Sequence, residues 1–192
     1  MFMARMKTSI RSLLRCDFAR REDGVIALEA MIMMPLLFWT FLALFSIFDT
    51  FRIYAANQKA AFTVSDAISR ETVPIDAAYL NGVHDMFEYL AMNNGQTAMR
   101  VSVIRFDAGN NTHELDWSQV RGYGHSALSD AQVAGWAGRL PVMVDNERII
   151  VVETWSTFEP AFRTGLERQE ITNFVFTRPR YAPQVCWLNC NS

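Results

Sequence analysis

One apolar stretch, residues 25–48, constrains the fold of this chain more than any other feature. Its 24 residues carry a single charge, that of Glu29. A helix of about 20 apolar residues is long enough to cross the hydrocarbon core of a bilayer. The sequence therefore predicts a transmembrane segment over residues 25–48. Because a carboxylate inside such a segment is energetically costly, Glu29 is a candidate functional residue.

The charges before this stretch predict its orientation. Residues 1–24 form a short basic leader with a net charge of +3, from six basic residues and three acidic ones. Basic residues beside a span stay on the cytoplasmic side, so we expect a single-pass protein with a cytoplasmic N-terminus and an exported C-terminal part. The whole chain has a net charge of −2 and a pI of about 5.9, which does not indicate nucleic acid as a partner.

A cleaved secretory signal peptide fits these residues poorly. The apolar run exceeds the 7–15 residues, approximately, of a signal-peptide core, and no Ala-x-Ala pair lies at its end. We therefore expect the segment to remain in the mature protein.

The helix is expected to continue beyond the membrane to about residue 71, because no proline or glycine occurs between Asp49 and Glu71. Pro35 lies inside the apolar part, where it is expected to kink the helix. A weakly amphipathic stripe runs along the same helix, and we expect it to pack on the protein's own soluble part rather than in an intermolecular coiled coil. The stripe consists of Leu44, Ile47, Phe51, Ala55, Gln58, Phe62 and Ser65.

Residues 72–192 are predicted to form a small α+β head. Apolar spacing indicates a second helix over 76–93 that stops at 93–95, and alternation then indicates about four antiparallel strands. The fold class is thus α+β, a long N-terminal transmembrane helix extending into a head with a second helix and a sheet. Ile150 and Trp155 are expected to be buried in a central strand. The strands are predicted at 97–106, 112–120, 148–158 and 170–178, with a short helix capped by Ser129 in the loop 126–139.

The three cysteines divide between the two predicted sides of the membrane. Cys16 lies in the leader, where the cytoplasm keeps thiols reduced, whereas Cys186 and Cys190 lie in the exported part, where a disulfide persists. We therefore favour a disulfide between them; their spacing also resembles half of a metal site, and free thiols are the other alternative.

Known catalytic motifs are absent from the sequence. The chain has no nucleophile elbow, no phosphate-binding glycine loop and no His-x3-His pair. The segment 122–126 is interpreted as a glycine-rich turn, and 107–113 as a hairpin tip rather than a calcium loop. His84, His113 and His125 are widely separated along the chain. We therefore expect no enzyme activity, no cofactor and no metal site.

Two hypotheses account for Gly24 and Glu29. In the first, Gly24 only begins the helix, and Glu29, about 7.5 Å further along it, reaches the lipid headgroups. In the second, the chain is cut after Gly24 and the new amine of Val25 pairs with the Glu29 carboxylate of a neighbouring subunit. A buried charge is far less costly when paired than alone, so such a pair would set the register between subunits.

The junction Arg20-Arg-Glu-Asp-Gly24-Val-Ile-Ala-Leu-Glu29 resembles the leader junction of type IV pilin-like proteins. Together with Pro35 and the long apolar span, it resembles the TadE/TadF-like minor pseudopilins of the tight-adherence (Flp/Tad) pilus. The resemblance covers about 30 residues. It implies a bacterial inner-membrane protein with a periplasmic head, cut between Gly24 and Val25 by a prepilin peptidase, in which Glu29 and Pro35 take part in helix packing.

The leading functional hypothesis is therefore a structural assembly subunit of a pilus or secretion apparatus. Its partners would be other pilin-like subunits and the inner-membrane assembly machinery. The alternative is an uncleaved single-span protein whose periplasmic head binds a ligand or partner.

Overall fold

The computed structural model describes residues 23–92, 96–160, 162, 165 and 167–190. The chain divides into two compact units, Met1–Ile47 and Phe48–Ser192; we call the second the head unit. Three sequence-based predictions lie outside the described residues. They concern residues 1–22 of the leader, the thiol of Cys16 and the helix stop at 93–95.

The long helix α2, Asp23–Ser69, contains 47 residues and is continuous through Pro35. The helix ends where the sequence predicts, just before Thr72-Val73-Pro74. Its last turn tightens, with the N–H groups of Arg70 and Glu71 donating to carbonyls three residues back. The kink expected at Pro35 stays a prediction.

The apolar part of α2 exposes its side chains on every side. Each residue from 25 to 41 is exposed, and large apolar side chains such as Met31 (75 %) and Phe38 (65 %) are among them. Of the helices that the structure describes, α2 alone contains, within Val25–Ser69, a stretch long and apolar enough to cross a membrane. The structure is thus compatible with a single span.

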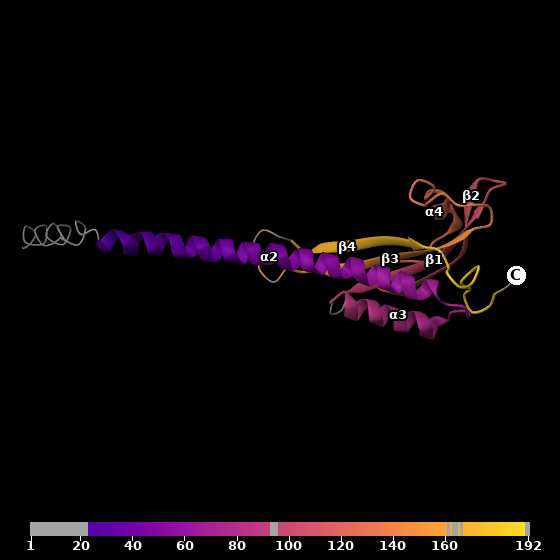
Figure 1. Cartoon of the computed structure of the whole chain (residues 1–192), viewed down its shortest axis with the longest axis horizontal. Helices are drawn as coiled ribbons and strands as arrows, with labels where there is room; N and C mark the ends of the chain where they lie inside the picture. Colours follow the sequence, from indigo (N-terminus) through magenta and orange to yellow (C-terminus); the bar gives the residue numbers. More distant parts are fainter. Residues whose placement is uncertain (1–22, 93–95, 161, 163–164, 166, 191–192) are drawn as a thin grey trace, which may run out of the picture. The chain divides into compact units, whose positions relative to one another are not determined.

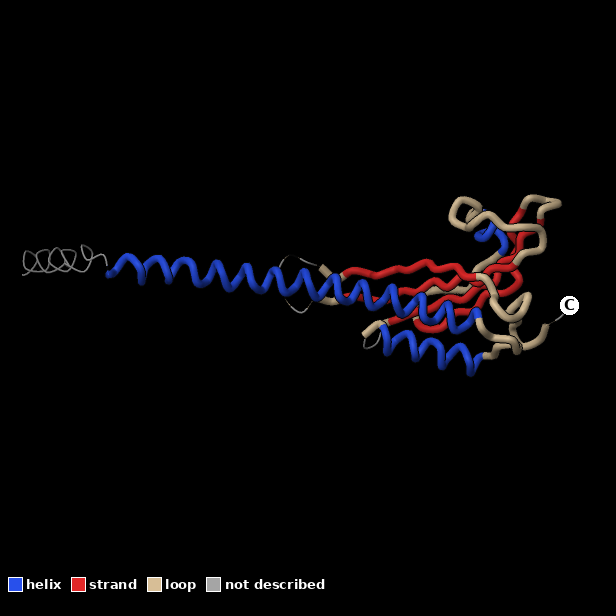
Figure 2. Tube along the Cα trace, in the orientation of Figure 1, coloured by secondary structure: helices blue, strands red, loops and turns tan. Residues whose placement is uncertain are grey.

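The head unit is built on a four-stranded antiparallel sheet in the order β2-β1-β3-β4. The other helices are α3, Ala77–Leu90, which begins at the cap Asp76, and the short α4, Asp130–Ala134, which begins at Ser129. Figures 1 and 2 show these elements. The α+β class predicted from the sequence is confirmed. The strands are β1 Thr97–Asp107, β2 Thr112–Gly122, β3 Arg148–Phe158 and β4 Gln169–Thr177.

One face of the sheet is covered by two helices. The C-terminal part of α2 and all of α3 lie side by side on this face (Figure 1). Period-two alternation sends every second residue of β1 and β3 toward the helices. The resulting core contains Ala60, Val64 and Ile68 of α2, Leu80, Val83 and Phe87 of α3, Met99, Val101 and Val103 of β1, and Ile150 and Val152 of β3.

The opposite face of the sheet is covered by α4 and the loops around it. The β1–β2 register shifts between Val103 and Ile104, where Asp116 of β2 is the extra, unpaired residue, and such a bulge bends its strand. This second core contains Ile104, Leu128, Val133, Leu140, Met143, Ile149 and Val151. Because both faces are covered, the central strand β3 is buried along almost its whole length. Ile150 is fully buried and Trp155 is 9 % exposed, as predicted for a central strand.

The amphipathic stripe predicted on α2 does not form the contact expected of it. Phe51 is 71 % exposed and Phe62 is 55 % exposed. The face that packs on the head carries mainly small residues, namely Asn57, Ala60, Ala61, Val64, Ser65, Ile68 and Ser69. Small side chains allow a helix to approach the sheet closely, so close packing prevailed over the burial of larger apolar groups. The predicted packing face was therefore wrong, apart from Ser65.

A buried polar contact holds α2 in its position within the head unit. Asn57 is fully buried. Its amide oxygen accepts a 2.6 Å hydrogen bond from Ser156 of β3, and its amide nitrogen donates to the carbonyls of Ile53 and Ala91. A buried amide needs such partners, so this contact specifies which face of α2 meets the sheet.

The C-terminal tail is attached to the start of α3 and to β2. Ile75 donates to the carbonyl of Cys186 and accepts from the N–H of Leu188, both at 2.9 Å. The indole of Trp117 in β2 donates to the carbonyl of Val185 at 2.8 Å. These hydrogen bonds fix the cysteine-bearing segment against the rest of the head unit.

Candidate functional site

The sequence-predicted site in the apolar helix lies at the beginning of α2. Gly24, Val25, Glu29 and Pro35 are all helical, so the predicted cleavage junction lies within the helix. Glu29 is exposed. Among the described residues, none forms a hydrogen bond or ion pair with its carboxylate. The structure therefore leaves Glu29 available to a partner outside the described part of the chain.

The head unit carries a second candidate site, an open pocket of about 520 Å³ between α3 and the end of β2. This volume lies in the usual range for small-ligand sites. The pocket is lined by Asn81, His84, Asp85 and Glu88 of α3, Thr97 of β1, and Arg121, Gly122 and Tyr123 at the end of β2.

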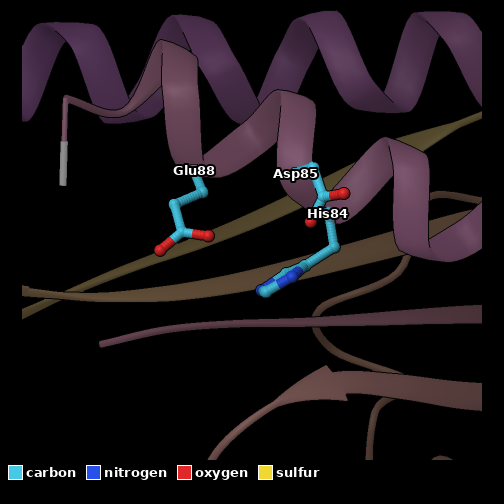
Figure 3. Close-up of side chains that lie close together, drawn as sticks. All are labelled: His84, Asp85 and Glu88. Atoms are coloured by element: carbon cyan, nitrogen blue, oxygen red, sulfur yellow. The ribbon is translucent and has the colours of Figure 1, made fainter. Parts of the chain in front are cut away.

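Three potential metal ligands meet in this pocket. Each of His84, Asp85 and Glu88 offers one ligand atom, and these atoms lie within 4.8 Å of one another. Figure 3 shows the three side chains projecting from neighbouring turns of α3. The apolar spacing predicted this helix but did not reveal the cluster. The i, i+4 spacing of His84 and Glu88 was the signal that could have revealed it.

A glycine shapes the edge of the pocket at the end of β2. Gly122 has φ +89°, and a Cβ at this position would lie 2.1 Å from the carbonyl oxygen of Thr97. Glycine is the residue that accepts both this conformation and so close an approach of two backbones. Residues 123–126 then leave the strand in bends and coil, as predicted for a glycine-rich turn.

His125 packs against the sheet instead of entering the pocket lining. Its ring stacks on Trp155 with centroids 3.7 Å apart, and the guanidinium carbon of Arg100 lies 5.1 Å from the same indole. His113 lies near the β1–β2 hairpin, with its ring 5.1 Å from that of Phe106. The three histidines are therefore not brought together.

Residues 107–113 form the β1–β2 hairpin tip, as predicted. Asp107 accepts hydrogen bonds from the side chain of Asn110 and from the backbone N–H groups of Asn110 and Gly109. These bonds lower the pKa of Asp107 below its ordinary value, the Asn110 side chain having the largest effect. The carboxylate is thus engaged in closing the turn.

The structure contains a disulfide between Cys186 and Cys190, whose Cα atoms are 5.2 Å apart. Cys186 is buried, whereas Cys190 is exposed. The bridge closes a short loop around Trp187, whose ring lies 5.9 Å from that of Trp117. We interpret it as a structural element of the tail.

The disulfide predicts resistance to alkylation. A Cys16→Ser chain, denatured so that burial protects no thiol, should gain no label from iodoacetamide. After reduction it should gain two, which intact mass spectrometry would resolve. Labelling of both residues without reductant would contradict the bridge.

Comparisons with models of known protein families, with curated proteins and with solved structures found no match to this chain.

Proposed function

We propose that this protein is a structural assembly subunit of a pilus or secretion apparatus, similar to a minor pseudopilin. It is anchored in the bacterial inner membrane by α2, with its N-terminus in the cytoplasm and its head unit in the periplasm. It acts by packing its apolar helix against other pilin-like helices and the assembly machinery, not by catalysis.

One observation carries this proposal: inside an exposed apolar helix lies a carboxylate, that of Glu29, with no partner among the described residues. Lipid tails satisfy apolar side chains such as Leu28 and Phe38, but they cannot satisfy Glu29. A cation supplied by another subunit satisfies it. The resemblance of the junction around Gly24 to a prepilin leader identifies a source for that cation, the α-amine of Val25 that cleavage would create.

The test is the replacement of Glu29 by glutamine in the full-length chain, expressed in cells lacking the original copy. Glutamine keeps the shape of the side chain and removes its charge. We expect assembled surface filaments to fall at least tenfold while the amount of protein in the membrane fraction stays unchanged. Such a drop corresponds to about 1.4 kcal/mol or more of lost coupling between subunits.

A matched control replaces an exposed carboxylate of the head unit. Glu167 is exposed, and Glu167→Gln should assemble as the unchanged protein does. Normal filament assembly by Glu29→Gln would refute the pairing role of this residue. The intact mass of protein extracted from membranes should also show the loss of residues 1–24.

The pocket between α3 and β2 favours a second candidate function. In this alternative, an uncleaved single-span protein presents a head that binds a ligand. This alternative would be supported over assembly by two results together. The intact mass would be that of the full-length chain, and Glu29→Gln would leave filament assembly unchanged.

A further inference from the structure

The arrangement of ligands in the α3 pocket supports a metal site. His84 and Glu88 are one helical turn apart and so project from the same side of α3. Asp85 adds a third donor, with all three ligand atoms within 4.8 Å of one another (Figure 3). Tetrahedral zinc, with bonds near 2.0–2.2 Å, requires ligand atoms roughly 3.4 Å apart. The Glu88 side chain is long and the Asp85 side chain is exposed. Rotation of these two side chains is therefore enough to shorten the separation of the ligand atoms to this value.

The imidazole of His84 is already oriented by the protein. Its Nε2 atom lies 3.1 Å from the hydroxyl oxygen of Thr97, a residue that is 4 % exposed at the start of β1. This hydrogen bond engages one ring nitrogen and leaves Nδ1 to bind a metal ion. In metal-binding histidines, a hydrogen bond from the ring nitrogen that does not bind the metal usually orients the ring.

The charge of the pocket also favours a cation. Asp85 and Glu88 contribute two negative charges against the one guanidinium in the described lining, that of Arg121. This guanidinium donates at 2.6 Å to Asn81 and at 2.7 Å to the carbonyl of Val120. It also lies 5.8 Å from the ring of Trp187. Arg121 is therefore engaged by groups other than the two carboxylates.

We propose that His84, Asp85 and Glu88 bind one divalent transition-metal ion, with zinc as the best match. Imidazole nitrogen and carboxylate oxygen are both zinc ligands, and a water or a partner's side chain completes the tetrahedron from the open pocket. The site joins α3 to β1 through Thr97. It is independent of the membrane helix, so it stands whether or not the chain assembles into filaments.

The experiment measures zinc binding to the full-length chain in detergent. The protein carries Cys16→Ser and no histidine tag, is treated with a chelator, and is kept non-reduced so that Cys186 and Cys190 offer no thiolates. Equilibrium dialysis against Zn²⁺ with metal analysis should give one ion per chain at micromolar concentrations. Zinc should also raise the melting temperature of the head unit.

Two variants and one control decide the outcome. His84→Ala and Glu88→Gln should each weaken zinc binding at least tenfold, whereas Glu167→Gln should leave it unchanged. Glu88→Gln is nearly isosteric, so it remains decisive if His84→Ala fails to fold. The proposal is overturned if no zinc is retained at roughly 100 μM, about a hundredfold above a micromolar Kd. It is equally overturned if Glu88→Gln binds zinc as the unchanged chain does; the carboxylates would then be an ordinary solvated helix face.

Discussion

Replacing Ile150 with aspartate is expected to unfold the head unit. Ile150 is fully buried in β3, opposite Val103 of β1 and Thr177 of β4, and it contacts the core beneath α2 and α3. Burying an unpaired carboxylate there costs several kcal/mol in addition to the lost apolar contacts. Since the stability of a domain is about 5–15 kcal/mol, this single change is large enough to remove most of it.

The measurement is thermal unfolding followed by tryptophan fluorescence, together with protease resistance, on the full-length protein in detergent. Ile150→Val should cost only about 0.5–1.5 kcal/mol. Val142 is 94 % exposed, so Val142→Asp, which adds the same charge at the surface, should change stability by less than about 0.5 kcal/mol. Under the proposed anchoring by residues 25–48, the Ile150→Asp chain should still enter the membrane fraction. A folded, protease-resistant Ile150→Asp head would contradict the burial of this strand.

Replacing Glu153 with alanine is expected to destabilise the head unit by about 3–5 kcal/mol. Glu153 lies directly opposite Arg100 in the β1–β3 register, and the two side chains form an ion pair at 2.5 Å while only 7 % and 12 % exposed. Without the carboxylate, the Arg100 guanidinium keeps the carbonyl of Ser126 and the ring of Trp155. Its charge then stays largely buried and uncompensated.

A double substitution distinguishes the contribution of the ion pair itself from the cost of leaving the Arg100 charge buried without a partner. Arg100→Met combined with Glu153→Leu should recover most of the stability, because well-packed apolar residues replace a buried pair at little cost. Arg70→Ala provides the surface control, since Arg70 pairs with Asp66 but is 51 % exposed and such pairs contribute little. Chemical unfolding of the four proteins gives the comparison. A loss below about 1 kcal/mol for Glu153→Ala would show that water reaches the pair.

Local patterns in the sequence predicted most elements of the head unit. The bounds of β3 match the prediction, and β1 and β2 begin at the predicted residues. The second helix begins next to the predicted residue 76, which is its cap, and the predicted cap Ser129 is also found. These features depend on neighbours in sequence, namely caps, turns and alternation. The β2 and β4 bounds shift by one or two residues because the partner strand decides where pairing ends.

Features that depend on distant residues were not predicted. The packing face of α2 was assigned to large apolar residues such as Phe51 and Phe62. The buried face consists mainly of alanines and serines, together with Asn57, Val64 and Ile68. The pocket was missed for the same reason. Its lining combines α3 with Thr97 and Arg121, which meet only when the sheet has formed.

By itself, the sequence determined the apolar helix, its isolated Glu29 and the α+β composition of residues 72–192, because length, hydrophobicity and period act locally along the chain. Only the tertiary structure decided the strand order β2-β1-β3-β4, the face that α2 presents to the sheet, and the meeting of His84 with Thr97. These three features depend on close packing and on hydrogen bonds between residues far apart in the sequence. A local sequence pattern does not specify such contacts.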